Sequence, residues 1–119
     1  MATYTGDATI TRADRISGSV GASDASGTYV LYTVPAGHFA EVQIFSASGS
    51  TQNADVATVA VGPFILINVS GNGGLGSVSY QSDLKLIDEG ETIRLTIVQS
   101  GVPDANAAIN VMIKEYNKP

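Results

Sequence analysis

Residues 28–48, TYVLYTVPAGHFAEVQIFSAS, constrain the fold of this chain more than any other stretch. Residues 29–34 are β-branched, aromatic or leucine, a composition that suits a pleated, half-buried surface better than a helix. Pro35 has a fixed φ and no amide hydrogen, so it cannot continue a central strand, and Gly37 permits the positive φ of a tight reversal. The stretch therefore predicts two β-strands joined at a corner.

Three segments alternate apolar and polar residues with the period of two that marks a strand with one solvated face. They are residues 40–44, 91–99 and 108–116. Residues between the apolar positions, such as Glu41 and Arg94, are expected to face solvent. The side chains expected to face the core are Ala40, Val42, Ile44, Ile93, Leu95, Ile97, Ile109, Val111 and Ile113.

The rest of the chain after residue 48 also divides into short strands separated by turns. Residues 55–61 alternate between small and β-branched residues, which predicts a strand buried on both faces. Residues 64–70, FILINVS, contain an apolar run too short and too β-branched for a helix, which predicts a core strand. With shorter strands at 77–80 and 84–87, eight or nine strands and no helical period predict an all-β chain, an antiparallel β-sandwich. The count favours a jelly roll of about eight strands.

Residues 1–27 differ from the rest because they are rich in Thr, Ser, Ala and Gly and carry few large apolar groups. Short strands are expected around residues 8–13 and 15–20, followed by a loop. Two interpretations are open: a pair of edge strands, or an arm that leaves the domain and pairs with a neighbouring subunit. The predicted organisation is an N-terminal arm or edge strands at 1–27 and a β-sandwich domain at 28–119.

Charge and cysteine content exclude several classes of function. The net charge is −5 with six Lys and Arg, which argues against a surface that tracks nucleic-acid phosphates. The absence of cysteine excludes disulfides, a thiol nucleophile and thiolate metal sites, and fits folding in a reducing cytoplasm. Neither a secretion signal nor a membrane-spanning apolar run is expected. Charged residues make up only 14% of the chain, so we expect other subunits to cover part of its mild surface.

Gly71, Gly73 and Gly76 have the GxGxxG spacing of a dinucleotide site and follow a predicted strand. Such a site requires a helix after the glycines, because the helix N-terminus holds the pyrophosphate. The sequence that follows, SVSYQSDLKL, is strand-like. We therefore expect a hairpin loop here and no cofactor.

Two other groups of residues could carry chemistry. His38 is the only histidine and follows the corner glycine, so we expect it in a solvated turn; three copies on a trimer axis would be needed for a metal site. Asp88, Glu89 and Glu91 could act as acid and base or bind calcium if they converged on one pocket. Around Gly90 they are expected to form a solvated turn. The sequence predicts no catalytic, cofactor-binding or metal residue, and no enzyme activity.

Four aromatic residues deserve comparison with a carbohydrate-binding platform. Tyr29, Tyr32, Phe39 and Phe45 could stack on sugars if they shared one exposed sheet face. Aromatic content is only 7% and there is no Trp. Core packing or a subunit interface is the more ordinary use of such residues.

Three segments resemble small β-sandwich structural proteins of tailed bacteriophage virions. They are YTVPAGHFAEV at 32–42, LKLIDEGETIRL at 84–95 and INVMIKEY at 109–116. In that group a strand ending in a VPAG-type corner recurs, as does an L-x-x-G-[DE]-T-I turn into a strand. The turn lies here at residues 86–93, with one extra residue before Gly90. The resemblance covers residues 28–116.

The resemblance implies a jelly-roll-like virion protein of the capsid decoration (cement) type. Such a protein would bind the major capsid protein on the outer capsid surface as a homotrimer and stabilise the head, after synthesis in the host cytoplasm. No nucleic-acid or membrane partner is implied, and a capsid-anchoring arm would lie in residues 1–27. The alternative is a phage fibre or receptor-binding module that recognises host surface glycans. A third hypothesis is a small enzyme acting through the Asp88–Glu91 cluster.

Overall fold

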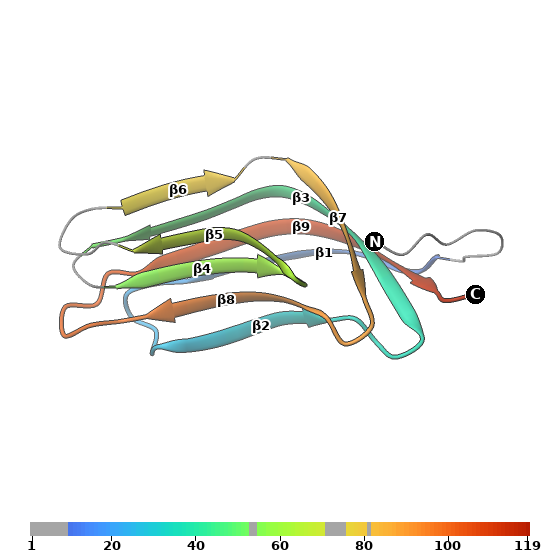
Figure 1. Cartoon of the computed structure of the whole chain (residues 1–119), viewed down its shortest axis with the longest axis horizontal. Helices are drawn as coiled ribbons and strands as arrows, with labels where there is room; N and C mark the ends of the chain where they lie inside the picture. The colour runs from blue at the N-terminus through green and yellow to red at the C-terminus, as the bar shows by residue number, and fades with distance from the viewer. Residues whose placement is uncertain (1–9, 53–54, 71–75, 81) are drawn as a thin grey trace.

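The structure is a computed structural model, and it describes residues 10–52, 55–70, 76–80 and 82–119, with the side chains of 76–80 outside the description. The described residues form nine strands and no helix (Figure 1). The strands are β1 (Ile10–Val20), β2 (Gly27–Thr33), β3 (His38–Thr51), β4 (Val56–Val61), β5 (Phe64–Ser70), β6 (Gly76–Tyr80), β7 (Asp83–Asp88), β8 (Thr92–Val98) and β9 (Asn106–Asn117).

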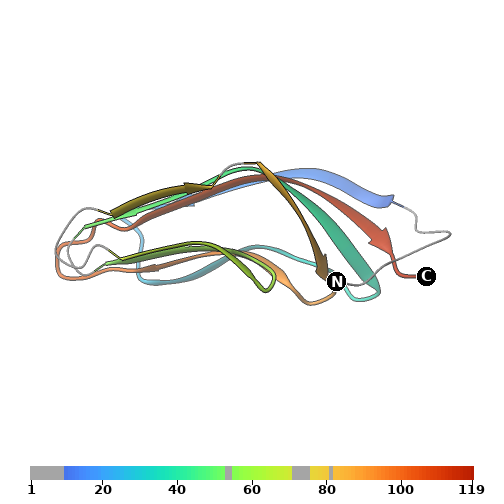
Figure 2. The same ribbon diagram turned by 45° about the horizontal axis from the view of Figure 1, so that its top comes forward.

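The strands form two sheets, which Figure 2 shows as two facing layers. One sheet has the order β1-β9-β3-β6, with β7 also paired to β3, and the other has the order β2-β8-β4-β5. Because β6 pairs with one end of β3 and β7 with the other end, the two act as one interrupted strand. Counted in this way, eight antiparallel strands follow the order of a jelly roll. The predicted all-β sandwich is confirmed.

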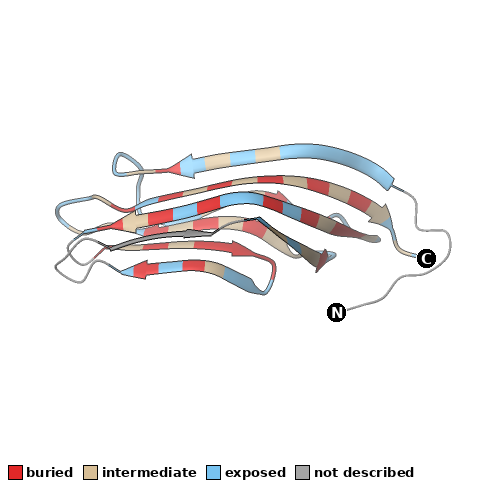
Figure 3. Ribbon diagram, turned by 90° about the horizontal axis from the view of Figure 1, so that it is seen from above, coloured by how far each residue is buried: buried red, intermediate tan, exposed pale blue. Residues whose placement is uncertain are grey.

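The core lies between the sheets, where alternate residues of each strand meet. Figure 3 shows this alternation as bands of buried and less buried residues along β3 and β9. All nine side chains predicted to face the core are buried, whereas Glu41 and Arg94 are partly exposed. The alternation of β-branched residues therefore predicted the inner surface of three central strands correctly.

The corner at residues 34–37 is present and is held by the turn between β7 and β8. Val34 donates its N–H to the carbonyl of Glu91 at 3.0 Å, and Gly90 donates to the carbonyl of Val34 at 2.9 Å. Gly37 has a φ of 79°, a conformation that favours glycine. These bonds end β2 at Thr33 and start β3 at His38, in the other sheet.

The interpretation of residues 64–70 as a core strand was wrong. β5 is an edge strand that pairs only with β4, and only alternate residues, Ile67 and Val69, are buried. Ile65 remains 63% exposed. An apolar run shows that both faces of the strand are apolar, but it does not show that other elements cover both faces.

β1 is one edge strand, paired along its length with β9, where two short strands were expected. Its register shifts between Ile10 and Arg12, as at a β-bulge. Residues 1–9, where part of the expected capsid-anchoring arm would lie, are outside the described residues. The whole molecule is elongated, with a longest dimension of 52 Å.

Candidate interaction surface

The outer face of the four-stranded sheet carries three rows of residues, most of them exposed or partly exposed, which we call the Thr–Val face. Strand register places Thr28, Thr96, Thr58 and Asn68 in one row across the four strands. Val30, Arg94, Ala60 and Ile65 form the next row. Val98 and Val56 form a third row beside the first. Many outward positions of these strands hold Thr, Val or Ile, because β-branched residues favour strands even where they face solvent.

The polar side chains of the Thr–Val face bond to one another. The hydroxyl oxygens of Thr28 and Thr96 are 3.0 Å apart, and the hydroxyl of Thr58 lies 3.5 Å from Oδ1 of Asn68. Cross-strand pairs of this kind stabilise a sheet. Because these groups are paired within the sheet, the row can contact a protein surface with less desolvation cost than free hydroxyls would bring.

Three aliphatic side chains of the face are exposed, whereas Ala60 is buried and Val56 is partly buried. Val30 is 54% exposed, Val98 is 50% exposed, and Ile65 has the largest exposure of the three. Arg94 is the only charged residue in the three rows, and its guanidinium donates to the carbonyl of Gly62 at 2.9 Å and the hydroxyl of Thr92 at 3.3 Å. The face therefore carries little charge and is apolar in patches, as expected of a surface that binds another protein.

A loop at residues 99–105 follows Val98 at the end of the sandwich (Figure 1). The loop is held in place by Asp55, which directly precedes β4 and is fully buried. The carboxylate of Asp55 accepts the backbone N–H of Ser100 at 2.7 Å and that of Asp104 at 2.8 Å. Burial alone would raise the pKa of Asp55, but the hydrogen bonds from Ser100 and Asp104 outweigh it and hold the pKa below its usual value.

The side chain of Gln99 makes a second set of bonds within the same loop. Its amide nitrogen donates to the carbonyl of Gly21 at 3.0 Å, and its amide oxygen accepts the N–H of Ala105 at 3.0 Å. The hydroxyl of Ser26 accepts the N–H of Gln99 at 2.7 Å. The loop is thus tied to the turn between β1 and β2 as well as to Asp55, yet Val102 at its tip is 66% exposed.

A second buried carboxylate, Glu115, lies toward the opposite end of β9. Its Oε2 accepts the hydroxyl of Tyr32 at 2.5 Å and lies 3.5 Å from Nη1 of Arg12. Burial, together with the hydrogen bond to Glu115, raises the pKa of Tyr32 above its usual value. Glu115 was not singled out from the sequence, although the alternation of residues 109, 111 and 113 extends to it.

The acidic turn predicted at residues 88–91 is present, but its three carboxylates do not converge on one site, because two bind Lys118 and the third accepts a backbone N–H. Lys118 lies 2.6 Å from Asp88 Oδ1 and 2.6 Å from Glu89 Oε1. Hydrogen bonds from Lys118 lower the pKa of Asp88 and of Glu89. Glu91 instead accepts the backbone N–H of Asp88 at 2.6 Å. Within the described residues no group of three or more His, Asp or Glu side chains is arranged to hold a metal.

The four aromatic residues considered for sugar binding do not form a shared platform. Tyr32 is buried beside Glu115, and Phe39 is buried with its ring stacked on Tyr116, centroids 5.0 Å apart. Tyr29 is half-buried and donates to the carbonyl of Ala25. Phe45 is partly exposed beneath the guanidinium of Arg15, which lies 4.9 Å from the ring centroid. These four residues therefore contribute to packing within the chain.

The remaining sequence motifs have structural places. Gly71 and Gly73 lie outside the described residues, and Gly76 begins the strand β6 where a dinucleotide site would need a helix. His38 begins β3 and is half-buried, with Nδ1 3.0 Å from the carbonyl oxygen of Ala36. None of the described segments is a helix long and apolar enough to cross a membrane.

The chain has similarity to known proteins only at the level of structure. No protein-family model matches the chain, and no curated protein matches it. Among solved structures it is similar to a chain of "Cyanophage Pam1 capsid asymmetric unit", with a TM-score of 0.39 and 15% sequence identity. The match covers 100% of this chain and 94% of that chain. This similarity does not assign the chain to a family.

Proposed function

We propose that this chain is a non-enzymatic structural protein of a tailed-phage virion, a decoration (cement) protein that binds the outer capsid surface as a homotrimer. The observation that carries the proposal is the Thr–Val face, a sheet face with exposed Val30, Val98 and Ile65 and one charged residue. The resemblance of residues 28–116 to decoration proteins supports the same function.

The Thr–Val face would act by adding contact area across joints between major capsid subunits. Burying its aliphatic side chains removes apolar surface from water, which is the main favourable term in protein association. Three such faces in one trimer would bind together, because the second and third attachments are intramolecular once the first has formed. The bound trimer would slow separation of the capsid subunits and so stabilise the head.

The test uses phage heads that lack this protein. We expect Val30→Asp combined with Ile65→Asp to reduce co-sedimentation with the heads by about tenfold or more, because each carboxylate would be buried without a partner. The matched control is Leu84→Asp, an equally exposed aliphatic residue on the other sheet, at 53%. Wild-type protein that fails to sediment with heads, or a double variant that binds as the wild type does, would contradict the proposal.

The glycan-binding alternative makes a different prediction. It requires exposed aromatic rings on one face, and the four aromatic residues considered for that role are dispersed by packing. Binding of the purified protein to a glycan array, with no affinity for heads, would favour this alternative over a cement role.

A further inference from the structure

We propose that the trimer is closed by a head-to-tail contact in which the loop at residues 99–105 of one copy enters a cavity on the next copy. This inference rests on the proposed function, because that function supplies the trimer. It assigns the contact to a specific pair of surfaces on the chain. One surface is the tip around Val102, and the other is a cavity on the outer face of the five-stranded sheet.

The tip has the properties of a preformed binding element. Both oxygens of the buried Asp55 carboxylate accept N–H groups on either side of Val102, and Gln99 ties the base of the loop to Gly21. Ser100 Oγ accepts the N–H of Val102 at 3.3 Å. A loop fixed in this way loses little conformational entropy on binding. Its exposed tip, Gly101, Val102 and Pro103, is uncharged.

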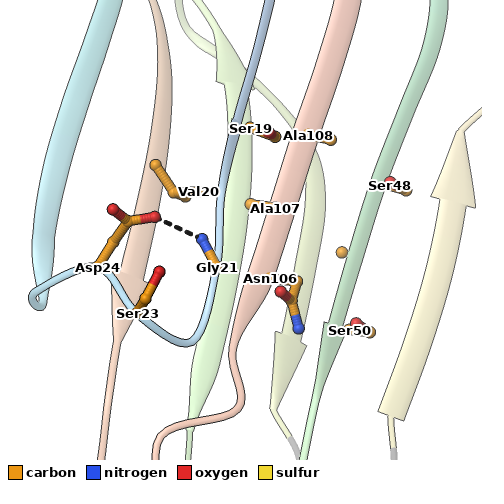
Figure 4. A pocket seen from close by; sticks show the side chains of 11 residues that line it. Ser19, Val20, Gly21, Ser23, Asp24, Ser48, Ser50, Asn106, Ala107 and Ala108 are labelled. Carbon is orange, nitrogen blue, oxygen red and sulfur yellow. Dashed lines mark hydrogen bonds between the residues drawn. The ribbon is translucent and has the colours of Figure 1, made fainter.

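The cavity opens near the same end of the sandwich and has a volume of about 510 Å³ (Figure 4). Ser19, Ala108 and Ser48 are cross-strand neighbours on β1, β9 and β3 and form its floor. Asn106 and Ser50 line the lower part of Figure 4. These side chains are small, so the sheet is hollowed where longer side chains would fill the space.

The rim of the cavity is also fixed and carries little free charge. The only charged residue among the lining residues is Asp24, and its carboxylate accepts the N–H of Gly21 at 2.8 Å. Asp24 in turn donates its N–H to the carbonyl of Gly21 at 2.9 Å. An uncharged tip therefore suits this cavity of small residues, because it adds no second charge next to the one carboxylate, which already accepts a backbone N–H.

The two surfaces are different patches of one molecule, so the contact between copies is heterologous. Contacts of this type form closed rings when the rotation between copies closes, and a threefold rotation gives a trimer. Each copy contributes one tip and one cavity. A copy with a damaged tip therefore still offers an intact cavity, and a copy with a filled cavity still offers an intact tip.

The experiment uses this asymmetry. Val102→Asp places a charge on the tip, and Ala108→Trp fills the cavity; both positions are at least partly exposed, so the fold should survive. By sedimentation velocity we expect three times the 12.2 kDa chain mass for the wild type and a single chain mass for each variant alone. Mixing the variants should restore one joint, from the intact tip of Ala108→Trp to the intact cavity of Val102→Asp. The mixture should therefore give a two-chain species.

Matched controls separate this contact from the capsid-binding face. Val98→Asp changes an exposed valine of the Thr–Val face, and Ser17→Trp adds a tryptophan on the outer face of β1 beyond the cavity. Both should remain trimeric, with circular dichroism showing that all four variants are folded. A folded Val102→Asp variant that stays trimeric, or a mixture without a two-chain species, overturns the inference.

The head-binding assay separates this inference from the cement function. A trimer that follows this pattern but does not bind heads supports the inference and refutes the cement function. A wild type that is not trimeric overturns the inference.

Discussion

Two carboxylates are buried among the residues that the structure describes, and they are satisfied in different ways. Asp55 accepts backbone N–H groups of a loop 45 and 49 residues away in sequence, whereas Glu115 accepts a tyrosine hydroxyl and lies beside an arginine. These backbone donors remain when Asp55 is replaced, so its loss leaves them without that acceptor. The donors of Glu115 are side chains, which can be replaced together with it. Asp55 therefore fixes the backbone of a loop, whereas Glu115 links side chains of strands that are already paired in their sheets.

Removing the loop carboxylate should have the largest effect. We expect Asp55→Ala to lower the Tm by about 10 °C or more, because two partly buried N–H groups lose an acceptor that is itself fully buried. The control is Asp24→Ala, an exposed carboxylate that accepts one N–H and should cost much less. Differential scanning calorimetry measures both. Equal effects of the two substitutions would show that the buried carboxylate has no special role in the loop.

The pH dependence of stability also tests Asp55, with a substitution, Asp55→Asn, that changes the shape of the side chain little. Because the folded-state pKa of Asp55 lies below its unfolded value of about 4, its stabilising effect is present above that pH and is lost as pH falls through the folded pKa. The Tm difference between wild type and Asp55→Asn should be constant at neutral pH and shrink in acid. A difference that grows as the pH falls would contradict this assignment.

The side-chain network around Glu115 should tolerate paired replacement. We expect Tyr32→Phe to lower the free energy of unfolding by about 1 kcal/mol, because the carboxylate loses one donor but keeps Arg12 nearby. Glu115→Leu alone should cost more, since it leaves the tyrosine hydroxyl buried and unpaired. The double variant should be less destabilised than the sum of the two single variants. Additivity in a urea-denaturation cycle would show that the two side chains are not coupled.

The ion pairs of the acidic turn should contribute least. Lys118 contacts Asp88 and Glu89, but both carboxylates are about half exposed, so solvent screens the attraction. Lys118→Met should change the Tm by less than about 2 °C at moderate salt. A larger change that persists at high salt would show that this turn resembles the buried carboxylates more than a surface pair.

Much of the sandwich could be predicted from local patterns, but its polar networks could not. Period-two alternation identified the inward residues of β3, β8 and β9, and Pro35 with Gly37 located the corner. Sheet order depends on which strands pair side by side, and a local pattern does not show this, so β5 was mistaken for a core strand. Asp55 meets partners far along the chain, and one aspartate before a strand carries no signal of such contacts. The exposed tip at Val102 was likewise undetectable, because a valine in a loop does not reveal its burial.

The long pairing of β3 with β9 has a mechanical consequence. It runs from His38 opposite Asn117 to Ser50 opposite Asn106, nearly the full length of both strands. Hydrogen bonds between antiparallel strands lie perpendicular to the strand direction, so a pull along the strands shears the whole ladder at once. A pull across the sheet opens the ladder one bond after another. The pair of β3 and β9 should thus resist a force along the strands far better than a force across the sheet.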